Sequence, residues 1–589
     1  MILLFGGTTE GRAGSKALDE SGSTFYYSTS SDAQELEMAN GIRLTGKMDE
    51  RDIVCFCKDK GIQLIVDAAH PFAEALHKNI LTAASRLCLP VIRYERIYPE
   101  RSDGIVWCKD FDDAIQKMES RGVDSLLVLT GVKSISKLKE FRKRHDCFFR
   151  ILDRDDSRSI ASDEGVTANH LLYYGADDLN AFVDKHSIHT ILTKESGMSG
   201  GFIEKTNWAF SRGLQVFAIS RPAYPPINTD PKLEIVFVNG PHGLRRQVER
   251  LLPEFYPLHS GLTTGTCATA AAVAQTVRLF DGLMPGSVDV VMPDGETISV
   301  DVTYGDGYAS VFKQSGDDPD VTNGVEIRAS ISKAADFTVE GGKGVGRFTL
   351  PGFDYPPGES AINRVPRKMV IDNVSRHTSI PIKVVISVPD GEAIASRTFN
   401  PRLGIEGGIS IIGVSGIVKP YSEEAFVDSI RKCMEVAKAS GAERIVINSG
   451  GKSANHVQRV YPTLPRQAYV EYGNLIGDTL KIADELGIKT ITIGLMLGKA
   501  IKLAEGHLDT HSKKSTFNRN FIQRLLDEIG CDKDISNITL ARELWKIIPQ
   551  SRLPLFCDSV KSHCLDVCKS VYHQGIPEII LIDNDGGIH

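Results

Sequence analysis

A turn of small and polar residues follows the first apolar segment of the sequence. Residues 2–5 are apolar and lead directly into five such residues: Gly6, Gly7, Thr8, Thr9 and Glu10. Helical spacing begins at Arg12, and a glycine-rich turn between a strand and a helix lets backbone N–H groups approach a phosphate. The turn therefore predicts a dinucleotide cofactor, although a tight strand-to-helix turn without a ligand would use the same residues.

The residue that usually selects the nicotinamide cofactor is missing from this pattern. An acidic side chain about 20 residues beyond the glycine turn normally binds the ribose of NADH. The second predicted strand ends instead in Ser28, Thr29 and Ser30. The sequence therefore leaves the choice between NADH and NADPH open.

Glycine-rich clusters recur in the last third of the chain, directly after apolar segments. Residues 448–451 follow a predicted strand at 444–447, and residues 494–499 follow another at 490–493. Open parallel sheets bind nucleotide-like cofactors at the carboxyl ends of their strands. We therefore expect Gly450, Gly451 and Gly498 to contact a cofactor.

Three further patterns have weaker chemical meaning. Thr264 and Thr266 open an alanine-rich segment, which predicts either an anion- or substrate-binding helix start or a helix that packs closely because its residues are small. Residues 341–347 are glycine-rich but lack the Walker pattern. Cys564 and Cys568 have helical spacing without a C-x₂-C pattern, so we predict thiols and no protein-bound metal.

Apolar strands and amphipathic helices must position these residues, and they alternate through residues 1–250. The strand candidates there include 2–5, 24–28, 64–66, 91–94, 125–129, 147–151, 190–193 and 215–219. Such alternation predicts parallel sheets built from βαβ units. We predict an α/β protein whose N-terminal unit has two Rossmann-like parallel-sheet halves that meet near Gly122.

The alternation breaks at two prolines, Pro253 and Pro257. We interpret residues 253–257 as a linker after a first unit at 1–252. Residues 258–380 are rich in Gly, Thr and short β-like runs, which predicts an α+β domain. From 381 to 589 the βα alternation resumes, with strand candidates at 382–388, 444–447, 490–493 and 578–582. This last region is predicted to be a C-terminal Rossmann-like α/β domain.

The composition excludes several classes of partner. The 589 residues carry a net charge of −7, which argues against nucleic acid or an anionic membrane surface as the main partner. The eleven cysteines are an odd number and lie mostly in apolar segments, so they predict reduced thiols in a cytoplasmic protein. No apolar run is long enough for a membrane span. A homo-oligomer is an open alternative to a monomer.

The motifs of residues 1–250 resemble those of the precorrin-6A reductase family (CbiJ/CobK type) in order and spacing. They are GGTTEGR, DAAHPFA, PVIRYER, LTG, TKESG and ISRP. The resemblance implies hydride transfer from NADH or NADPH to a ring double bond of a corrin precursor, with the residues from Gly6 to Glu10 as the cofactor turn. It makes His70 a candidate proton donor and Lys194 a candidate partner for a substrate carboxylate. Alternatively, His70 caps the helix start at Pro71, and Lys194 lies on the surface.

The motifs of residues 258–589 resemble the cobalt-precorrin-5B C-1 methyltransferase family (CbiD type). They are TTGTCATAAA, DPDVTNG, GESAINRVPR, GNLIGD, GKAIKLAEG and THS. The resemblance implies S-adenosylmethionine (SAM) as methyl donor and adds Asn474 and Gly477 to the expected cofactor residues. His511 is the candidate base, with a structural role as the alternative. Four arginines are candidate clamps for substrate carboxylates or ordinary solvated residues: Arg364, Arg367, Arg397 and Arg402.

Together the two resemblances predict a bifunctional enzyme of cobalamin biosynthesis. Methylation of cobalt-precorrin-5B would give cobalt-precorrin-6A, and its reduction would give cobalt-precorrin-6B. The expected partners are small-molecule cobalt corrinoids, so the cobalt belongs to the substrate. The alternatives are an NAD(P)-dependent oxidoreductase of another metabolite fused to an unrelated transferase, and a tetrapyrrole-binding scaffold without turnover.

Overall fold

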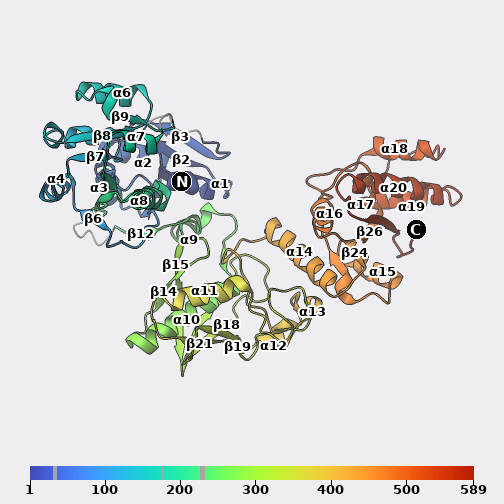
Figure 1. Ribbon diagram of the computed structural model, residues 1–589. Helices are drawn as coiled ribbons and strands as arrows, with labels where there is room; N and C mark the ends of the chain where they lie inside the picture. The colour runs from blue at the N-terminus through green and yellow to red at the C-terminus, as the bar shows by residue number, and fades with distance from the viewer. Residues whose placement is uncertain (31–35, 176–177, 226–232) are drawn as a thin grey trace. The chain divides into compact units, whose positions relative to one another are not determined.

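Two compact units make up the structure, a computed structural model that describes residues 1–30, 36–175, 178–225 and 233–589. Unit 1 comprises Met1–His259 together with Asp294–Ile298 (Figure 1). Unit 2 comprises Ser260–Pro293 and Ser299–His589. Among the described residues, no helix has the length and apolar character that crossing a membrane requires.

The first sheet of unit 1 is six-stranded and entirely parallel, in the order β12-β5-β4-β1-β2-β3. Its strands are β1 (Ile2–Phe5), β2 (Phe25–Thr29), β3 (Gly41–Thr45), β4 (Leu64–Asp67), β5 (Val91–Tyr94) and β12 (Ile235–Val238). Two helices cover each face: α1 (Thr9–Asp19) and α9 (Pro241–Leu251) on one, α2 (Glu50–Lys60) and α3 (Glu74–Leu87) on the other. Ile2 and Leu4 point to the first pair and Leu3 and Phe5 to the second, so both faces are buried.

The second sheet of unit 1 is also six-stranded and parallel, in the order β6-β11-β10-β7-β8-β9. Its strands are β6 (Ile105–Cys108), β7 (Ser125–Val128), β8 (Asp146–Ile151), β9 (Leu171–Tyr173), β10 (Thr190–Lys194) and β11 (Gln215–Ile219). The main helices are α4 (Phe111–Ser120), α6 (Asp155–Asp163), α7 (Leu179–Lys185) and α8 (Phe202–Ser211), and a single turn, α5 (Ser134–Lys137), follows β7. The predicted pair of parallel sheets is confirmed.

The chain passes from the first sheet to the second well before Gly122, which corrects the expected junction near this residue. β6 precedes the other strands of the second sheet and pairs with β11 at its edge. β12 follows all of them and returns to β5 at the edge of the first sheet. The chain therefore enters the second sheet between β5 and β6. Gly122, with φ of 64°, instead forms the turn after α4, inside the second half.

The segment expected to be a linker, residues 253–257, belongs to the core of unit 1. Phe255 and Tyr256 are buried and pack with residues of β1, α1 and α9. The Tyr256 hydroxyl donates to the Ala17 carbonyl oxygen at 2.7 Å. Burial of two aromatic rings is favourable by several kcal/mol, which is why this proline-rich stretch folds onto the unit rather than extending from it.

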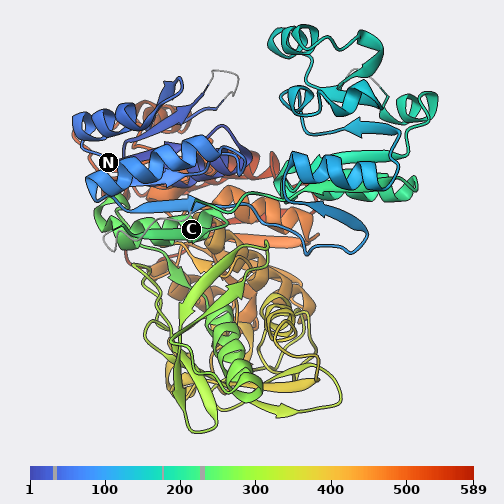
Figure 2. The same cartoon turned by 90° about the vertical axis from the view of Figure 1, so that its left-hand side faces the viewer.

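Unit 2 begins with a mixed five-stranded sheet, in the order β16-β17-β18-β21-β19. The strands are β16 (Thr303–Gly305), β17 (Tyr308–Phe312), β18 (Glu326–Lys333), β19 (Thr338–Gly341) and β21 (Ile382–Ser387). Helix α10 (Thr264–Asp281) lies along this sheet, with α11 (Arg364–Val374) beside it (Figure 2). The first fourteen residues of α10 are all buried, which its small alanine, glycine and threonine side chains make feasible.

The position of β21 corrects the expected domain boundary at residues 380 and 381. β21 pairs antiparallel with β18 and parallel with β19, so it belongs to the mixed sheet and not to the C-terminal sheet. Its residues alternate between buried and half-buried, as in a sheet covered on one face only. The apolar run at 382–388 is thus a strand of the region it was expected to follow.

A four-stranded parallel sheet closes the chain, in the order β25-β24-β26-β27. The strands are β24 (Arg444–Asn448), β25 (Tyr469–Glu471), β26 (Thr490–Met496) and β27 (Ile576–Ile582). The longer surrounding helices are α14 (Glu423–Ala439), α15 (Lys452–Val460), α16 (Ile476–Glu485), α17 (Leu497–Ala504), α18 (Arg519–Glu528) and α20 (Leu553–Lys569). Cys564 and Cys568 lie buried in α20 within the core, and burial raises the pKa of Cys568 to about 12.

Candidate active sites at the carboxyl ends of the strands

The glycine turn after β1 is tied to two neighbouring strands. Thr8 caps α1: its hydroxyl oxygen accepts from the Gly11 N–H at 2.9 Å and donates to the Ala68 carbonyl oxygen at 2.7 Å. The Gly7 N–H donates to the Tyr27 hydroxyl at 3.0 Å. A Cβ on Gly6 would stand 2.3 Å from the Tyr27 ring, whereas one on Gly7 would meet nothing within 4 Å. The turn packs against the Tyr27 ring at Gly6 and faces open space at Gly7. The Thr9 side chain is exposed.

Glu10 links this turn to the second half of unit 1. Its buried carboxylate accepts from Arg96 Nε at 3.0 Å and from the Ser199 hydroxyl, and Arg96 Nη1 donates to the Ser196 carbonyl oxygen at 2.6 Å. Burial by itself would raise the pKa of Glu10, but the Ser199 hydrogen bond and the Arg96 charge outweigh it and lower the pKa. The Glu10 carboxylate therefore fastens the turn to the segment that follows β10.

His70 and Lys194 both lie near the Phe72 ring. The Lys194 ammonium stands 4.9 Å from the centre of that ring, and the His70 ring centre is 5.8 Å from it. His70 Nδ1 accepts from the Phe72 N–H at 3.2 Å, so the proton of the neutral ring resides on Nε2. Desolvation and the positive charges of Arg96 and Lys194 lower the pKa of His70 to about 4. His70 thus both closes its turn and presents one N–H donor.

A buried polar network beneath His70 escaped the sequence analysis. The Asp67 carboxylate contacts His77 Nδ1 at 2.6 Å, Arg93 Nη1 at 3.1 Å and the Tyr224 hydroxyl at 2.9 Å. His77 Nε2 contacts the His70 carbonyl oxygen at 3.1 Å. Asp67, His77 and Arg93 are nearly inaccessible to solvent. The sequence does carry a signal for this network. Asp67 and Arg93 lie in the apolar runs LIVD and VIRY, and buried charges must be paired.

The glycine turn after β24 borders a cavity of about 740 Å³. Gly450 and Gly451 have φ values of 84° and 56°, and the Gly450 N–H donates to Asn448 Oδ1 at 2.8 Å. The cavity is lined by Arg402, Asn448, Gly451, Ala454, Asn455, Gln458, Pro462, Leu464, Arg466, Tyr469 and Glu471. Of the expected cofactor residues of unit 2, Gly451 alone is in this lining.

Other residues expected to bind the unit 2 cofactor hold the segment around Thr510. The Gly477 N–H donates to the Leu508 carbonyl oxygen at 2.9 Å, and a Cβ on Gly477 would stand 2.7 Å from Leu508. The Asn474 carbonyl oxygen accepts from the Thr510 N–H at 3.1 Å. Close packing therefore explains the glycine at 477 without a ligand. Gly498 lies in the first turn of α17 and is exposed.

His511 closes a turn of the same segment. Its N–H donates to Asp509 Oδ1 at 2.9 Å, and its Nδ1 accepts from the Lys513 N–H at 3.1 Å. With Nδ1 occupied as an acceptor, the neutral ring carries its proton on Nε2 and offers a donor rather than a base. This geometry favours the structural alternative for His511.

The expected substrate residues near α10 and α11 differ in how they are engaged. Thr264 Oγ1 accepts from the Ile412 N–H at 2.8 Å, and Thr266 Oγ1 donates to the Gly416 carbonyl oxygen at 2.7 Å. Both hydroxyls thus fasten α10 to the segment 410–416. Arg364 is exposed at the start of α11, and the Arg367 guanidinium lies 4.2 Å from the Tyr355 ring centre. Of these four, the two arginines are the ones with exposed or half-exposed side chains.

Both units are similar to known proteins. A family model described as Precorrin-6x reductase CbiJ/CobK matches residues 1–236, and the CbiD model matches residues 253–420. A cobalt-precorrin-5B C(1)-methyltransferase of Prosthecochloris aestuarii is 38% identical over 353 residues, covering 56% of this chain and 95% of the relative. The corresponding Thermus thermophilus protein is 40% identical over 305 residues, covering 50% of this chain and 83% of the relative. The chain belongs to both families.

Two solved structures resemble the separate parts of this CbiJ/CobK–CbiD fusion. One is a CobK precorrin-6A reductase, 20% identical with a TM-score of 0.35, covering 43% of this chain and 97% of that one. The other is the cobalamin biosynthesis protein cbiD of Archaeoglobus fulgidus, 30% identical with a TM-score of 0.26, covering 46% and 84%. The chain thus joins a precorrin-6x reductase to a cobalt-precorrin-5B C1-methyltransferase.

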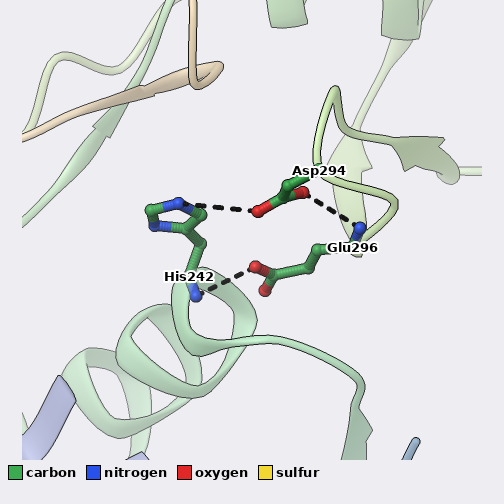
Figure 3. A group of neighbouring side chains, drawn as sticks. All are labelled: His242, Asp294 and Glu296. Atoms are coloured by element: carbon green, nitrogen blue, oxygen red, sulfur yellow. Dashed lines mark hydrogen bonds and ion pairs between the residues drawn. The ribbon is translucent and has the colours of Figure 1, made fainter. Parts of the chain in front are cut away.

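One group of side chains in the reductase unit of the fusion has the composition of a metal site. Among the described residues, His242, Asp294 and Glu296 bring one donor atom each within 4.8 Å of one another (Figure 3). The Glu296 carboxylate, however, accepts from the His242 N–H at 3.1 Å and from the Gly243 N–H, at the start of α9. Burial raises the pKa of Glu296 to about 7. These contacts account for Glu296 as a helix cap.

The cap comes from an unexpected part of the sequence. Residues 294–298 comprise the end of the turn between β14 (Ser287–Val291) and β15 (Thr297–Asp301) and the first two residues of β15, yet they belong to unit 1. The Thr297 N–H donates to Asn239 Oδ1 at 2.8 Å, directly before α9. A Cβ on Gly240 would stand 2.2 Å from the Glu296 side chain, so the glycine leaves room for this carboxylate. The reductase unit is therefore completed by residues beyond its family match.

Proposed function

We propose that the two units carry out consecutive steps on one corrin ring. Unit 2 transfers a methyl group from SAM to C-1 of cobalt-precorrin-5B. Unit 1 reduces the product, cobalt-precorrin-6A, to cobalt-precorrin-6B with NADH or NADPH. The observation that carries the proposal is that each unit has a glycine turn at the carboxyl end of a parallel strand, after β1 in unit 1 and after β24 in unit 2.

The first sheet of unit 1 suits a nicotinamide dinucleotide. The order β3-β2-β1-β4-β5 is that of a Rossmann-like half, with its switch point between β1 and β4. Gly7 has a φ of 87° and open space where a Cβ would stand, so a pyrophosphate can approach the backbone and the N-terminus of α1. A bound NADH or NADPH supplies the hydride.

His70 and Lys194 are the proposed groups of unit 1 that act on the substrate. Reduction adds a hydride and one proton to the ring. The proton comes from His70 Nε2 once the ring has also been protonated at Nδ1, which breaks the hydrogen bond from the Phe72 N–H. In the ligand-free protein the low pKa of His70 keeps it neutral. Carboxylates of the bound corrinoid offset the charges of Arg96 and Lys194, raise the pKa of His70 and allow it to carry the proton. Lys194 pairs with one of these carboxylates.

The chemistry of unit 2 needs orientation more than covalent participation. A bound SAM supplies an electrophilic methyl group. The residues that border the cavity hold it in line with C-1 of the ring and exclude water. Arg364 and Arg367 are the proposed partners of substrate carboxylates, since a guanidinium binds a carboxylate through two parallel hydrogen bonds.

The test is a mass measurement on the full chain with cobalt-precorrin-5B, SAM and either NADH or NADPH. The expected product has gained one methyl group and two further hydrogens, and omission of the nicotinamide leaves only the methylated ring. Methylation without reduction under complete conditions would contradict the assignment of unit 1. Tight corrinoid binding without any change of mass would contradict both assignments and favour a scaffold.

A further inference from the structure

An acidic side chain lies beside the second glycine turn. Glu471 ends β25, about 20 residues after Gly450 and Gly451, and β25 pairs with β24. A Cβ built on Gly450 would stand 3.4 Å from Glu471 Oε2, so this oxygen faces the turn. The side chain is 25% exposed, and it lines the same cavity as Gly451. A glycine turn and a carboxylate on adjacent parallel strands therefore border one open space.

Arg402 fixes the direction of this carboxylate. Arg402 Nη1 lies 2.7 Å from Glu471 Oε1, which leaves Oε2 on the side of the glycine turn. The guanidinium also lines the cavity, 5.4 Å from the Phe399 ring centre. From the sequence, Arg402 was either a candidate clamp for substrate carboxylates or an ordinary solvated residue, but here its partner is a carboxylate of the protein itself. The ion pair with Arg402 restricts the rotamers of Glu471.

The cavity has the size and the polarity that an adenosyl ligand needs. Its volume of about 740 Å³ lies within the usual range for ligand pockets, about 300–1,000 Å³. Asn455 and Gln458 of α15 add amide groups to the lining, and Pro462 and Leu464 add apolar surface. A carboxylate at the end of the second strand is where a ribose diol is bound when the pyrophosphate or its equivalent sits on the glycine turn of the first.

We propose that Glu471 recognises the ribose diol of SAM and that Arg402 is the positioning residue for its carboxylate. This inference rests on SAM being the methyl donor of unit 2. Glu471 accepts hydrogen bonds from the ribose hydroxyls through the oxygen that faces Gly450. Arg402 contributes indirectly, because it holds the other oxygen and so presents the free one to the ligand.

The test compares two ligands on the full chain by calorimetry: S-adenosylhomocysteine and its 2′-deoxy analogue. We expect Glu471→Gln to weaken binding of S-adenosylhomocysteine by about 10- to 100-fold, as for a hydrogen bond to a charged acceptor. The same variant should weaken binding of the deoxy analogue by a smaller factor, because that analogue offers Glu471 the 3′-hydroxyl alone. The matched control is Glu485→Gln, which removes the partner of another 2.7 Å surface ion pair, with Arg431, outside the cavity.

Arg402→Leu tests the positioning role. This variant should reduce the preference for S-adenosylhomocysteine over the deoxy analogue without lowering the melting temperature as a folding defect would. Equal loss of both ligands in Glu471→Gln, or unchanged binding of S-adenosylhomocysteine, would overturn the inference. If the parent chain binds S-adenosylhomocysteine with no preference over the deoxy analogue, the proposed role of Glu471 is wrong, but SAM remains the proposed methyl donor of unit 2. If the parent chain binds neither, the choice of SAM fails as well.

Discussion

The two glycine turns of the molecule differ in their packing. In unit 1, Gly6 is pressed against the Tyr27 ring, and the nearest carboxylate, Glu10, is already bound by Arg96 and Ser199. In unit 2, a Cβ on Gly451 would meet nothing within 4 Å, and the nearby carboxylate, Glu471, keeps one oxygen toward the turn. Each turn thus has one glycine that faces open space, Gly7 in unit 1 and Gly451 in unit 2, but the turn of unit 1 is also packed against an aromatic ring.

The position of the acid explains what each turn can select. In unit 1 the end of β2 carries Ser28 and Thr29, two uncharged residues that do not repel a 2′-phosphate. In unit 2 the equivalent strand, β25, ends in Glu471, which favours a ligand with unmodified ribose hydroxyls. Under the proposed function, the same turn would therefore serve different cofactors according to the residue that ends the neighbouring strand.

The largest expected effect comes from disturbing the packed turn of unit 1. Gly6→Ala places a Cβ 2.3 Å from the Tyr27 ring, and overpacking of this kind costs about 1–3 kcal/mol. We expect affinity for the nicotinamide dinucleotide and reductase turnover to fall by about 10- to 100-fold, while methyl transfer is unchanged. Gly104→Ala is the control, because its nearest contact would be an ordinary 3.4 Å. Equal activity of the two variants would show that the packing of Gly6 is not required.

An intermediate effect is expected when unit 1 receives the acid that unit 2 has. Ser30→Asp adds a carboxylate just beyond β2, where it repels a 2′-phosphate and can accept from a 2′-hydroxyl. We expect kcat/KM with NADPH to fall by about 10-fold and kcat/KM with NADH to fall less or rise. The uncharged Ser30→Asn should leave the ratio of the two constants nearly unchanged. A similar decrease of kcat/KM with NADPH and with NADH would show that the end of β2 does not recognise the ribose.

The smallest effect concerns the positive charge around the first turn. Lys194→Met keeps the apolar stem beside Phe72 but removes one of the cations that lower the pKa of His70 from 6.5 to about 4. The pKa of His70, followed by NMR titration, should rise toward 6.5. Because the folded protein disfavours the protonated ring, its stability falls as the pH drops from about 6.5 to about 4, and the variant should lose less over this window.

Lys185→Met, which removes an exposed lysine of α7, is the control for this titration. Its His70 titration should match that of the parent chain. An unchanged pKa of His70 in Lys194→Met would contradict the electrostatic link between the two residues and, with it, the proposed effect of substrate carboxylates on His70.

In the three parallel sheets, the central strands could be predicted from the sequence, whereas the edge strands, apart from β27, could not. The predicted runs at 2–5, 91–94 and 215–219 coincide with β1, β5 and β11, whose residues are almost entirely buried. Strands buried on both faces read as continuous apolar runs. In the three parallel sheets, five strands were absent from the predictions, and each lies at the edge of its sheet: β3, β6, β9, β12 and β25. Edge strands are partly exposed and carry mixed residues, as in the sequence GIRLT of β3.

The parts of the sites that escaped the sequence analysis depend on contacts between distant segments. Glu471 ends β25, an edge strand of three residues without a long apolar run. Its place beside the glycine turn, about 20 residues after it, therefore could not be predicted from the sequence. The pairing of Glu10 with Ser199 and of Asp67 with Tyr224 joins residues more than 150 positions apart. Local periodicity specifies an element, but tertiary packing decides its neighbours.

The turn between β14 and β15 makes the maturation of unit 1 depend on residues that are synthesised after it. Glu296 caps α9, and α9 packs beside α1, the helix that opens at the first glycine turn. Domains generally fold in the order in which they leave the ribosome. Here helix α9 of the reductase unit is not capped until residue 296 has left the ribosome, when synthesis of the methyltransferase unit has already begun. Completion of the reductase unit thus requires that the first part of the methyltransferase unit has already been synthesised.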